Sequence, residues 1–136
     1  MDKLLKFYID GAWVTPHSAD TMPVLNPANE QQVAEVALGN EADVDRAVAA
    51  AKSAFESFSL TTKSERLALL WQIREVSDRR FEELAQAMRL EMGAPITMAR
   101  EAQADAAIGH LNGFISALEK LEQRENFENG EVLLRE

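Results

Sequence analysis

Apolar residues recur at helical spacing over the longest patterned stretch of the chain, residues 62–92. The steps are mostly three or four residues, with one of five around Arg80, which predicts one continuous helix about 45 Å long. Thr62-Lys63-Ser64-Glu65 is a capping box at its start, and Gly93 followed by Pro95 is a helix stop. Such a helix cannot bury its stripe alone, so we expect the rest of the chain to pack on it. The stripe consists of Leu69, Leu70, Ile73, Val76, Phe81, Leu84 and Met88.

Residues 6–38 carry short apolar runs separated by turn residues, which is typical of strands. Asp10-Gly11 lies between two such runs and predicts a two-residue hairpin, because a type I′ turn needs positive φ at both positions. Further strands are expected at Met22–Leu25 and Gln32–Leu38, with a turn at Asn26-Pro27-Ala28-Asn29 between them. Together they predict a small antiparallel meander, which needs a covering layer to be stable.

Two further helices are predicted, over 41–58 and 96–123. Asn40 is a good N-cap for the first, and Asp43 lies near the positive end of its dipole. The second contains Gly109 and Gly113, each of which costs roughly 1 kcal/mol of helix propensity. Close packing or the approach of a ligand would justify these glycines.

The last segment, 131–136, reads as an apolar strand after a polar stretch, Arg124–Gly130, that holds the turn signal Asn129-Gly130. A terminal strand with no partner after it is an exposed edge, which domains usually protect. The chain therefore reads as though it had been cut. The pattern as a whole predicts an α+β chain: an antiparallel meander, three helices and one C-terminal strand.

Composition limits the function classes. The chain has 136 residues, one domain's worth, with 23 acidic and 14 basic residues and a net charge of −9, which disfavours nucleic acid and anionic membrane as partners. No apolar run approaches a membrane span, and the N-terminus has no secretory h-region, so we expect a cytoplasmic protein. The chain has no cysteine, which excludes disulfides, thiolate metal sites and a cysteine nucleophile within it.

Little catalytic chemistry is visible in the residues. The six glycines are scattered and form no phosphate-binding loop. His17 lies in a polar loop and is read as solvated. His110 lies in a predicted helix, where packing or surface exposure is the favoured reading and lining a pocket the alternative. The two histidines have no metal-ligand spacing. The carboxylate pairs Glu82-Glu83 and Glu101 with Asp105 are read as solvated or dipole-compensating charges.

A series of short phrases in order resembles the N-terminal region of the aldehyde dehydrogenase superfamily, from about residue 7 to 136. Phe58 and Ala94 depart from it, where the family usually has tryptophan and commonly lysine. The phrases are Phe7-Tyr8-Ile9-Asp10-Gly11-Ala12-Trp13-Val14, Val24-Leu25-Asn26-Pro27-Ala28, Val33-Ala34-Glu35-Val36, Asp43-Val44-Asp45-Arg46-Ala47-Val48, Glu65-Arg66-Leu67-Ala68-Leu69-Leu70 and Glu91-Met92-Gly93-Ala94-Pro95.

The resemblance implies an α/β aldehyde dehydrogenase-like fold of which residues 1–136 form the N-terminal portion of the cofactor-binding domain. In the family, a cysteine thiolate attacks an aldehyde, hydride passes to NAD or NADP, and water hydrolyses the thioester. The cofactor motifs, the catalytic cysteine and the glutamate base lie further along, and 131–136 resembles the strand before the first cofactor-binding strand. The resemblance therefore implies an inactive fragment, about the first quarter of an enzyme that is commonly a homo-oligomer.

The resemblance also implies supporting sites. In several members, backbone oxygens before the Asn-Pro turn, a carboxylate at the end of the long helix and a later ligand hold a monovalent cation. The matching positions are Val24, Leu25 and Glu91, and oxygen ligands suit hard cations. The alternative is that Glu91 is a surface acid or caps a loop. Ala106 and His110 match positions that line the aldehyde tunnel in some members.

Three hypotheses follow. The chain is a fragment of an NAD(P)-dependent aldehyde dehydrogenase, or a helical interaction or structural protein that kept this region and lost catalysis. The third, a small binding module between the first and third helices, has no supporting residues. We also expect the isolated chain to self-associate, because helix faces and a strand edge lack partners.

Overall fold

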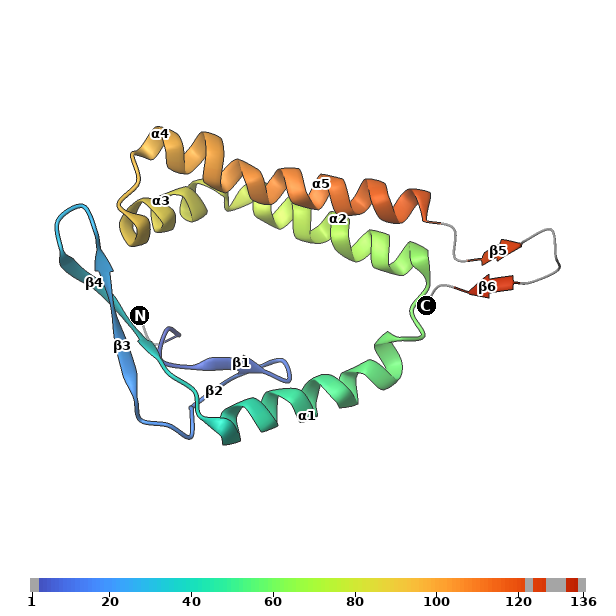
Figure 1. The fold of residues 1–136 in the computed structure, drawn as a ribbon, viewed down its shortest axis with the longest axis horizontal. Helices are drawn as coiled ribbons and strands as arrows, with labels where there is room; N and C mark the ends of the chain where they lie inside the picture. Colours follow the sequence, from blue (N-terminus) through green and yellow to red (C-terminus); the bar gives the residue numbers. More distant parts are fainter. Residues whose placement is uncertain (1–2, 122–123, 127–131, 135–136) are drawn as a thin grey trace.

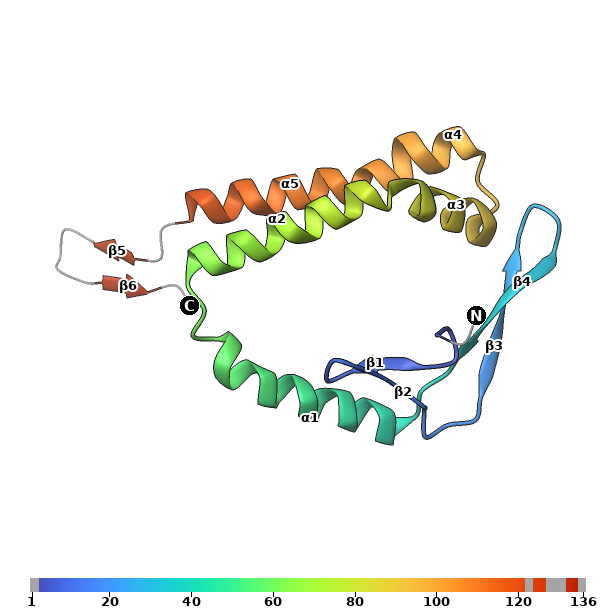
Figure 2. The same cartoon turned by 180° about the vertical axis from the view of Figure 1, so that it is seen from behind.

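The computed structural model describes residues 3–121, 124–126 and 132–134, which form an α+β chain arranged as an open arch (Figure 1). The run from α4 to α5 lies alongside α2 and α3 in both views (Figure 2), and α1 forms the opposite side. No helix in these ranges is both long and apolar enough to cross a membrane. The elements are β1 (Phe7–Ile9), β2 (Ala12–Val14), β3 (Thr21–Asn26), β4 (Gln31–Ala37), α1 (Glu41–Phe58), α2 (Lys63–Arg79), α3 (Phe81–Met92), α4 (Ile96–Met98), the π-helical η1 (Ala99–Ala104), α5 (Asp105–Lys120), β5 (Arg124–Asn126) and β6 (Val132–Leu134).

The N-terminal strands form two hairpins. Asp10 and Gly11 both have positive φ, 52° and 73°, so the two-residue turn between β1 and β2 is confirmed. The prediction of one meander over 6–38 is wrong, because β1–β2 and β3–β4 are separate two-stranded sheets. The loop between them is bonded to α1 instead: His17 N donates to a carboxylate oxygen of Asp43 over 2.8 Å. This contact leads the chain away from β2 before β3 begins.

The predicted continuous helix over 62–92 is two helices that meet at Arg80, whose φ of −104° and ψ of 13° break the helical path. The break falls at the step of five residues in the apolar stripe. In a straight helix, the extra residue in this step would rotate the apolar residues after Arg80 by about 100° relative to those before it. The break at Arg80 changes the direction of α3, and Ala85 of α3 is fully buried. The capping box at Thr62 and the left-handed stop at Gly93 are confirmed.

The predicted helix over 96–123 is also interrupted. It consists of α4, the π-helical segment η1 and α5, and it ends at Lys120 because Leu121 is extended. Packing of η1 on α3 uses small side chains: Ala99 and Ala104 of η1 are fully buried, as is Ala85 of α3. Small residues let the two backbones approach closely, and the other buried apolar residues of the described chain are Ile9 and Ile115.

The C-terminal strand has a partner strand that the sequence does not predict. Within 131–136 the structure describes β6, which pairs antiparallel with β5. The segment that holds β5, Arg-Glu-Asn, is polar and poor in strand-forming residues, so its composition does not predict a strand. This partner precedes β6 in the chain, and among the described residues each strand of the two-stranded sheet keeps one edge without a neighbouring strand. The predicted turn at Asn129-Gly130 lies outside the described residues.

Candidate functional site

The C-terminal end of α3 lies against the turn between β3 and β4. Gly93 ends α3 with a φ of 63°, and a Cβ added there would lie 2.9 Å from Ala28 N and 3.0 Å from Pro27 Cγ. Only glycine fits both that conformation and that approach. The contact joins the helix end that carries Glu91 to the hairpin that carries Val24 and Leu25.

The turn that receives Gly93 is fixed by its own hydrogen bonds. Asn26 accepts from Ala28 N through its side chain at 2.9 Å and from Glu30 N through its backbone oxygen at 2.7 Å. Glu30 takes a positive φ of 59°, which closes the turn into β4. An Asx turn of this kind gives the Asn-Pro sequence a physical role beyond its resemblance to a family motif.

A β-bulge lies at the predicted cation ligands. Val24 pairs with Ala34 and Leu25 with Gln32, so Val33 is left over on β4. Bulges interrupt the hydrogen-bond ladder and re-aim the strand. The structure thus brings the elements of all three predicted ligands into contact, with Leu25 and Glu91 exposed. Within the described ranges no three His, Asp or Glu side chains gather as a metal site, so a cation here would depend on backbone oxygens.

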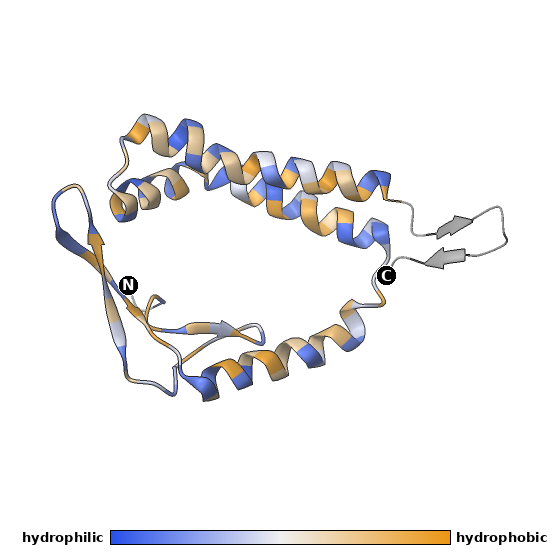
Figure 3. Ribbon diagram, viewed as in Figure 1, coloured by the Kyte–Doolittle hydropathy of each residue, from blue (hydrophilic) through white to orange (hydrophobic). Residues whose placement is uncertain are grey.

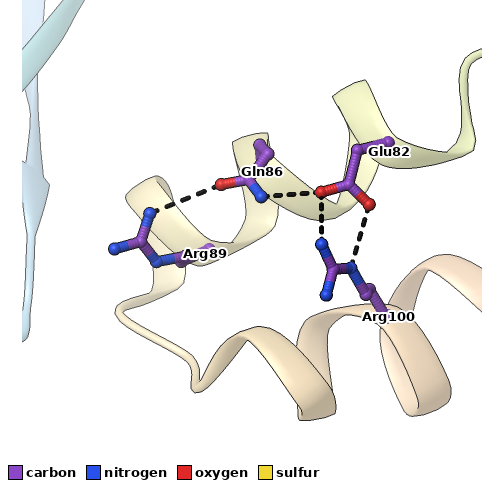
Figure 4. A network of polar contacts seen from close by, with 4 residues as sticks. All are labelled: Glu82, Gln86, Arg89 and Arg100. Carbon is purple, nitrogen blue, oxygen red and sulfur yellow. Dashed lines mark hydrogen bonds and ion pairs between the residues drawn. The ribbon is translucent and has the colours of Figure 1, made fainter.

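A polar network holds α3 to η1 (Figure 4). The Arg100 guanidinium donates to both oxygens of Glu82, at 2.9 and 2.7 Å, and Gln86 donates to the same carboxylate at 2.8 Å. Hydrogen bonds from Arg100, then from Gln86, lower the pKa of Glu82 to about 2. Arg89 extends the network by donating to Gln86 over 3.4 Å. Glu82 lies in the first turn of α3, where a solvated or dipole-compensating charge is expected, and its pairing with Arg100 of another element is not predicted by the sequence.

Gln103 of η1 adds a second link to the end of α3. Its side-chain nitrogen donates to Met92 Sδ at 3.3 Å, while its buried oxygen has no partner among the described residues. The Arg100 contact holds the first turn of α3, and the Gln103 contact holds its last turn, next to Glu91 and Gly93. No sequence signal indicated Gln103, because its role depends on the π-helical turn.

Ala106 and His110 are four residues apart on α5, so they lie on the same side of that helix, and both are exposed. Nothing lies within 4 Å of a Cβ added at Gly109 or Gly113. The close packing that would justify these glycines is thus absent from the described part of the chain. His17 is exposed as expected, and its backbone N–H makes the contact to Asp43.

Asp43 is the buried charged residue of the described chain, 4% exposed. Its carboxylate accepts from the backbone N–H groups of His17 at 2.8 Å, Ser18 at 3.4 Å and Asn40 at 3.1 Å. The bond from His17, then those from Asn40 and Ser18, lower its pKa against the opposing effect of burial. Asn40 accepts in return from Asp43 N. The Asn40–Asp43 spacing is a capping-box signal that predicts the two bonds between these residues, whereas the bonds from His17 and Ser18 come from a loop distant in sequence.

These features hold elements in place. The chain has no cysteine. Among the described residues the glycines lie apart, in a turn, before α1, at the end of α3 and within α5, and this part of the chain does not fit the phosphates of NAD or NADP.

Comparison with known proteins identifies the fold. The family model of the Aldehyde dehydrogenase family matches residues 13–134. A Pseudomonas sp. 3-succinoylsemialdehyde-pyridine dehydrogenase is 45% identical over 106 residues, 77% of this chain and 22% of that protein. A mutant of Pseudomonas syringae aldehyde dehydrogenase C, solved in complex with NAD⁺ and octanal, superposes with a TM-score of 0.89 at 44% identity, covering 93% of this chain and 26% of that one.

The aldehyde dehydrogenase of Bartonella henselae superposes equally well, with a TM-score of 0.89 at 36% identity and the same two coverages, 93% and 26%. The chain thus spans about a quarter of the length of the relatives it matches. The match runs through the β3–β4 turn, the end of α3 and the α4–α5 run. This chain belongs to the aldehyde dehydrogenase family and carries its N-terminal region.

Proposed function

We propose that this chain is the N-terminal portion of an oxidoreductase that oxidises an aldehyde to a carboxylic acid with NAD or NADP. The observation that supports this most is the superposition of 93% of the chain on whole aldehyde dehydrogenases, one of them solved with NAD⁺ and octanal. A later portion would supply the cysteine, the general base and the cofactor site. The chain's own residues act as scaffold, and alone it is inactive.

A chimera tests the proposal. Residues 1–136 of this chain would replace the matching quarter of Pseudomonas syringae aldehyde dehydrogenase C, with octanal and NAD⁺ as substrates. We expect NADH formation by the chimera and none by the pure chain. The alternative, a non-catalytic interaction protein derived from this family, predicts a folded but inactive chimera. Turnover by the pure chain would contradict the assignment of all catalytic groups to the later portion.

The same chimera tests the substrate-facing role proposed for Ala106 and His110. Both are exposed on one side of α5, as tunnel-lining residues need to be. Ala106→Trp adds bulk there, and we expect it to raise KM for octanal more than for a short aldehyde such as propanal. Glu119→Trp, at an exposed position near the end of α5, is the control. Equal effects of the two variants on both substrates would remove the tunnel role.

We also propose a monovalent cation at the β-bulge, held by the backbone oxygens of Val24 and Leu25 and by the Glu91 carboxylate. Support comes from the contact between α3 and β3 and from the irregular ladder at Val24 and Leu25. A cation bound to the folded state raises the unfolding temperature. We expect K⁺ or Na⁺ to stabilise the chimera over tetramethylammonium at equal ionic strength. Glu91→Gln should remove that difference, whereas Glu75→Gln, an exposed acid of α2, should keep it.

A further inference from the structure

The chain exposes far more surface than a compact protein of its size. Its accessible area is 10,305 Å², whereas a folded monomer of 15.1 kDa exposes about 7,100 Å². The excess on this one chain, roughly 3,000 Å², exceeds the share that each partner contributes to most obligate interfaces, whose totals over both partners run from about 2,000 to 5,000 Å². Apolar positions recur along α1 and α2 in the hydropathy view (Figure 3), so much of the exposed area belongs to residues that proteins bury.

Helix α1 provides the clearest part of this surface. Val44, Val48, Phe55 and Phe58 fall within one side of the helix, with Ala47 and Ala51 between them. Val44 is 59% exposed and Phe55 66% exposed. In the described chain, β1 is the main element packed on α1. We call Val44, Val48, Phe55 and Phe58 the α1 face.

The β1–β2 hairpin extends the α1 face. An open hollow of about 540 Å³ lies between them, lined by Tyr8 and Trp13 of the hairpin and by Val44 and Ala47 of the helix. Tyr8 is 63% exposed and Trp13 45% exposed, and their rings are 5.3 Å apart. Exposed aromatic pairs beside an apolar hollow are typical anchor points of protein interfaces.

We propose that the α1 face and this hollow are a docking surface for the later three quarters of an aldehyde dehydrogenase polypeptide, able to bind it without a peptide bond between the two parts. This inference rests on the proposed function. The two related structures contain the same fold as part of much longer chains, of which this chain covers 26%. The excess area has the size of an obligate interface rather than a transient one.

Charge argues against a second copy of this chain as the specific occupant. Each copy carries a net charge of −9, so a face-to-face dimer would bring two acidic molecules together, and like charges across an interface weaken binding. Binding of an apolar, neutral or basic polypeptide surface to the α1 face would not be weakened by this repulsion between like charges. We therefore expect any self-association of the free chain to be weak and without fixed stoichiometry.

The test uses the chimera with a protease recognition sequence after residue 136. After folding and cleavage, we expect the two parts to stay together as a 1:1 complex in size-exclusion chromatography with light scattering, and the amides of 44–58 to exchange more slowly than in the free chain. Phe55→Asp should weaken the complex about tenfold or more, as loss of an interface anchor does. Ser53→Asp, on the opposite side of α1, should change it less than about twofold.

Separation of the cut parts, or a stable dimer of this chain that the later part does not displace, would overturn the proposal. Equal effects of Phe55→Asp and Ser53→Asp would do so as well, and Val48→Asp repeats the comparison if Phe55→Asp lowers helicity in circular dichroism. An uncut chimera that is active but falls apart when cut refutes the docking inference alone. A cut chimera that stays together but has no activity refutes the enzymatic proposal alone.

Discussion

The close contact between Gly93 and the β3–β4 turn predicts that Gly93→Ala lowers the free energy of unfolding. Gly93→Ala places a methyl group on a residue with a φ of 63°, at 2.9 Å from Ala28 N. The left-handed conformation costs an L-residue about 1–2 kcal/mol. The overlap falls on backbone, which cannot rotate away, and overpacking of this kind costs about 1–3 kcal/mol. Together they predict a loss of roughly 2–5 kcal/mol in the free energy of unfolding.

Gly109→Ala is the matched control, because the same methyl group is added in helix α5 with nothing within 4 Å. Glycine costs a helix interior about 0.5–1 kcal/mol relative to alanine. This variant should therefore stabilise the isolated chain by about that amount. Urea unfolding followed by circular dichroism measures both, with midpoints that move in opposite directions.

Gly93→Asn separates the two costs at the turn. Asparagine tolerates the left-handed region far better than alanine, but its Cβ meets the same Ala28 backbone. We expect Gly93→Asn to recover part of the stability that Gly93→Ala loses and to remain below the wild type. An unchanged midpoint for Gly93→Ala would refute the close approach, and full recovery by Gly93→Asn would show that φ alone matters.

Three further predictions concern polar contacts. The lowered pKa of Asp43 means that its stabilisation is present above about pH 4 and is lost as the pH falls through its folded-state pKa. Asp43→Asn should therefore lower the unfolding temperature at pH 7, with a difference that shrinks below pH 4. Glu82, with a pKa of about 2, keeps its pairing with Arg100 until the pH falls towards 2. Glu82→Gln should speed hydrogen exchange in η1, whereas Glu83→Gln, whose partner Arg80 is three residues away, should not. Thr62→Ala removes the cap that accepts from Glu65 N at 3.2 Å and should cost about 1 kcal/mol in urea unfolding.

Features whose cause is local could be predicted from the sequence. The Asp10-Gly11 hairpin, the capping box at Thr62 and the stop at Gly93 each depend on residues a few positions apart, and each was confirmed. The break at Arg80 was visible as a step of five residues, but only the packing of α3 on η1 turns that irregularity into two helices. The π-helical segment and the partner strand β5 had no sequence signal, since neither contains distinctive residues.

In the candidate site too, local features could be predicted from the sequence and contacts between distant residues could not. Val24, Leu25 and Glu91 were named from a resemblance, and the sequence by itself gave no reason for strand β3 to meet the end of α3. That meeting depends on Gly93 and Ala28, which are distant in the chain. A glycine that ends a helix is already explained locally, so its second role, close approach to another element, could not be inferred without coordinates. The Glu82–Arg100 pair is hidden for the same reason.

The two glycines of α5 bear on what covers this chain. Gly109 and Gly113 weaken a helix and face open space, so nothing in the described part of the chain offsets their cost. If a later portion of the polypeptide packs closely at Gly109, the added methyl group should have opposite effects in two settings. Gly109→Ala should stabilise the isolated chain, as argued above, and destabilise the chimera, where the methyl group meets that portion. Unfolding midpoints of the two variant proteins against their parents measure the sign directly. Stabilisation of both the isolated chain and the chimera would show that no segment of the later portion approaches Gly109. The side of α5 that carries Gly109 would then remain exposed in the whole enzyme.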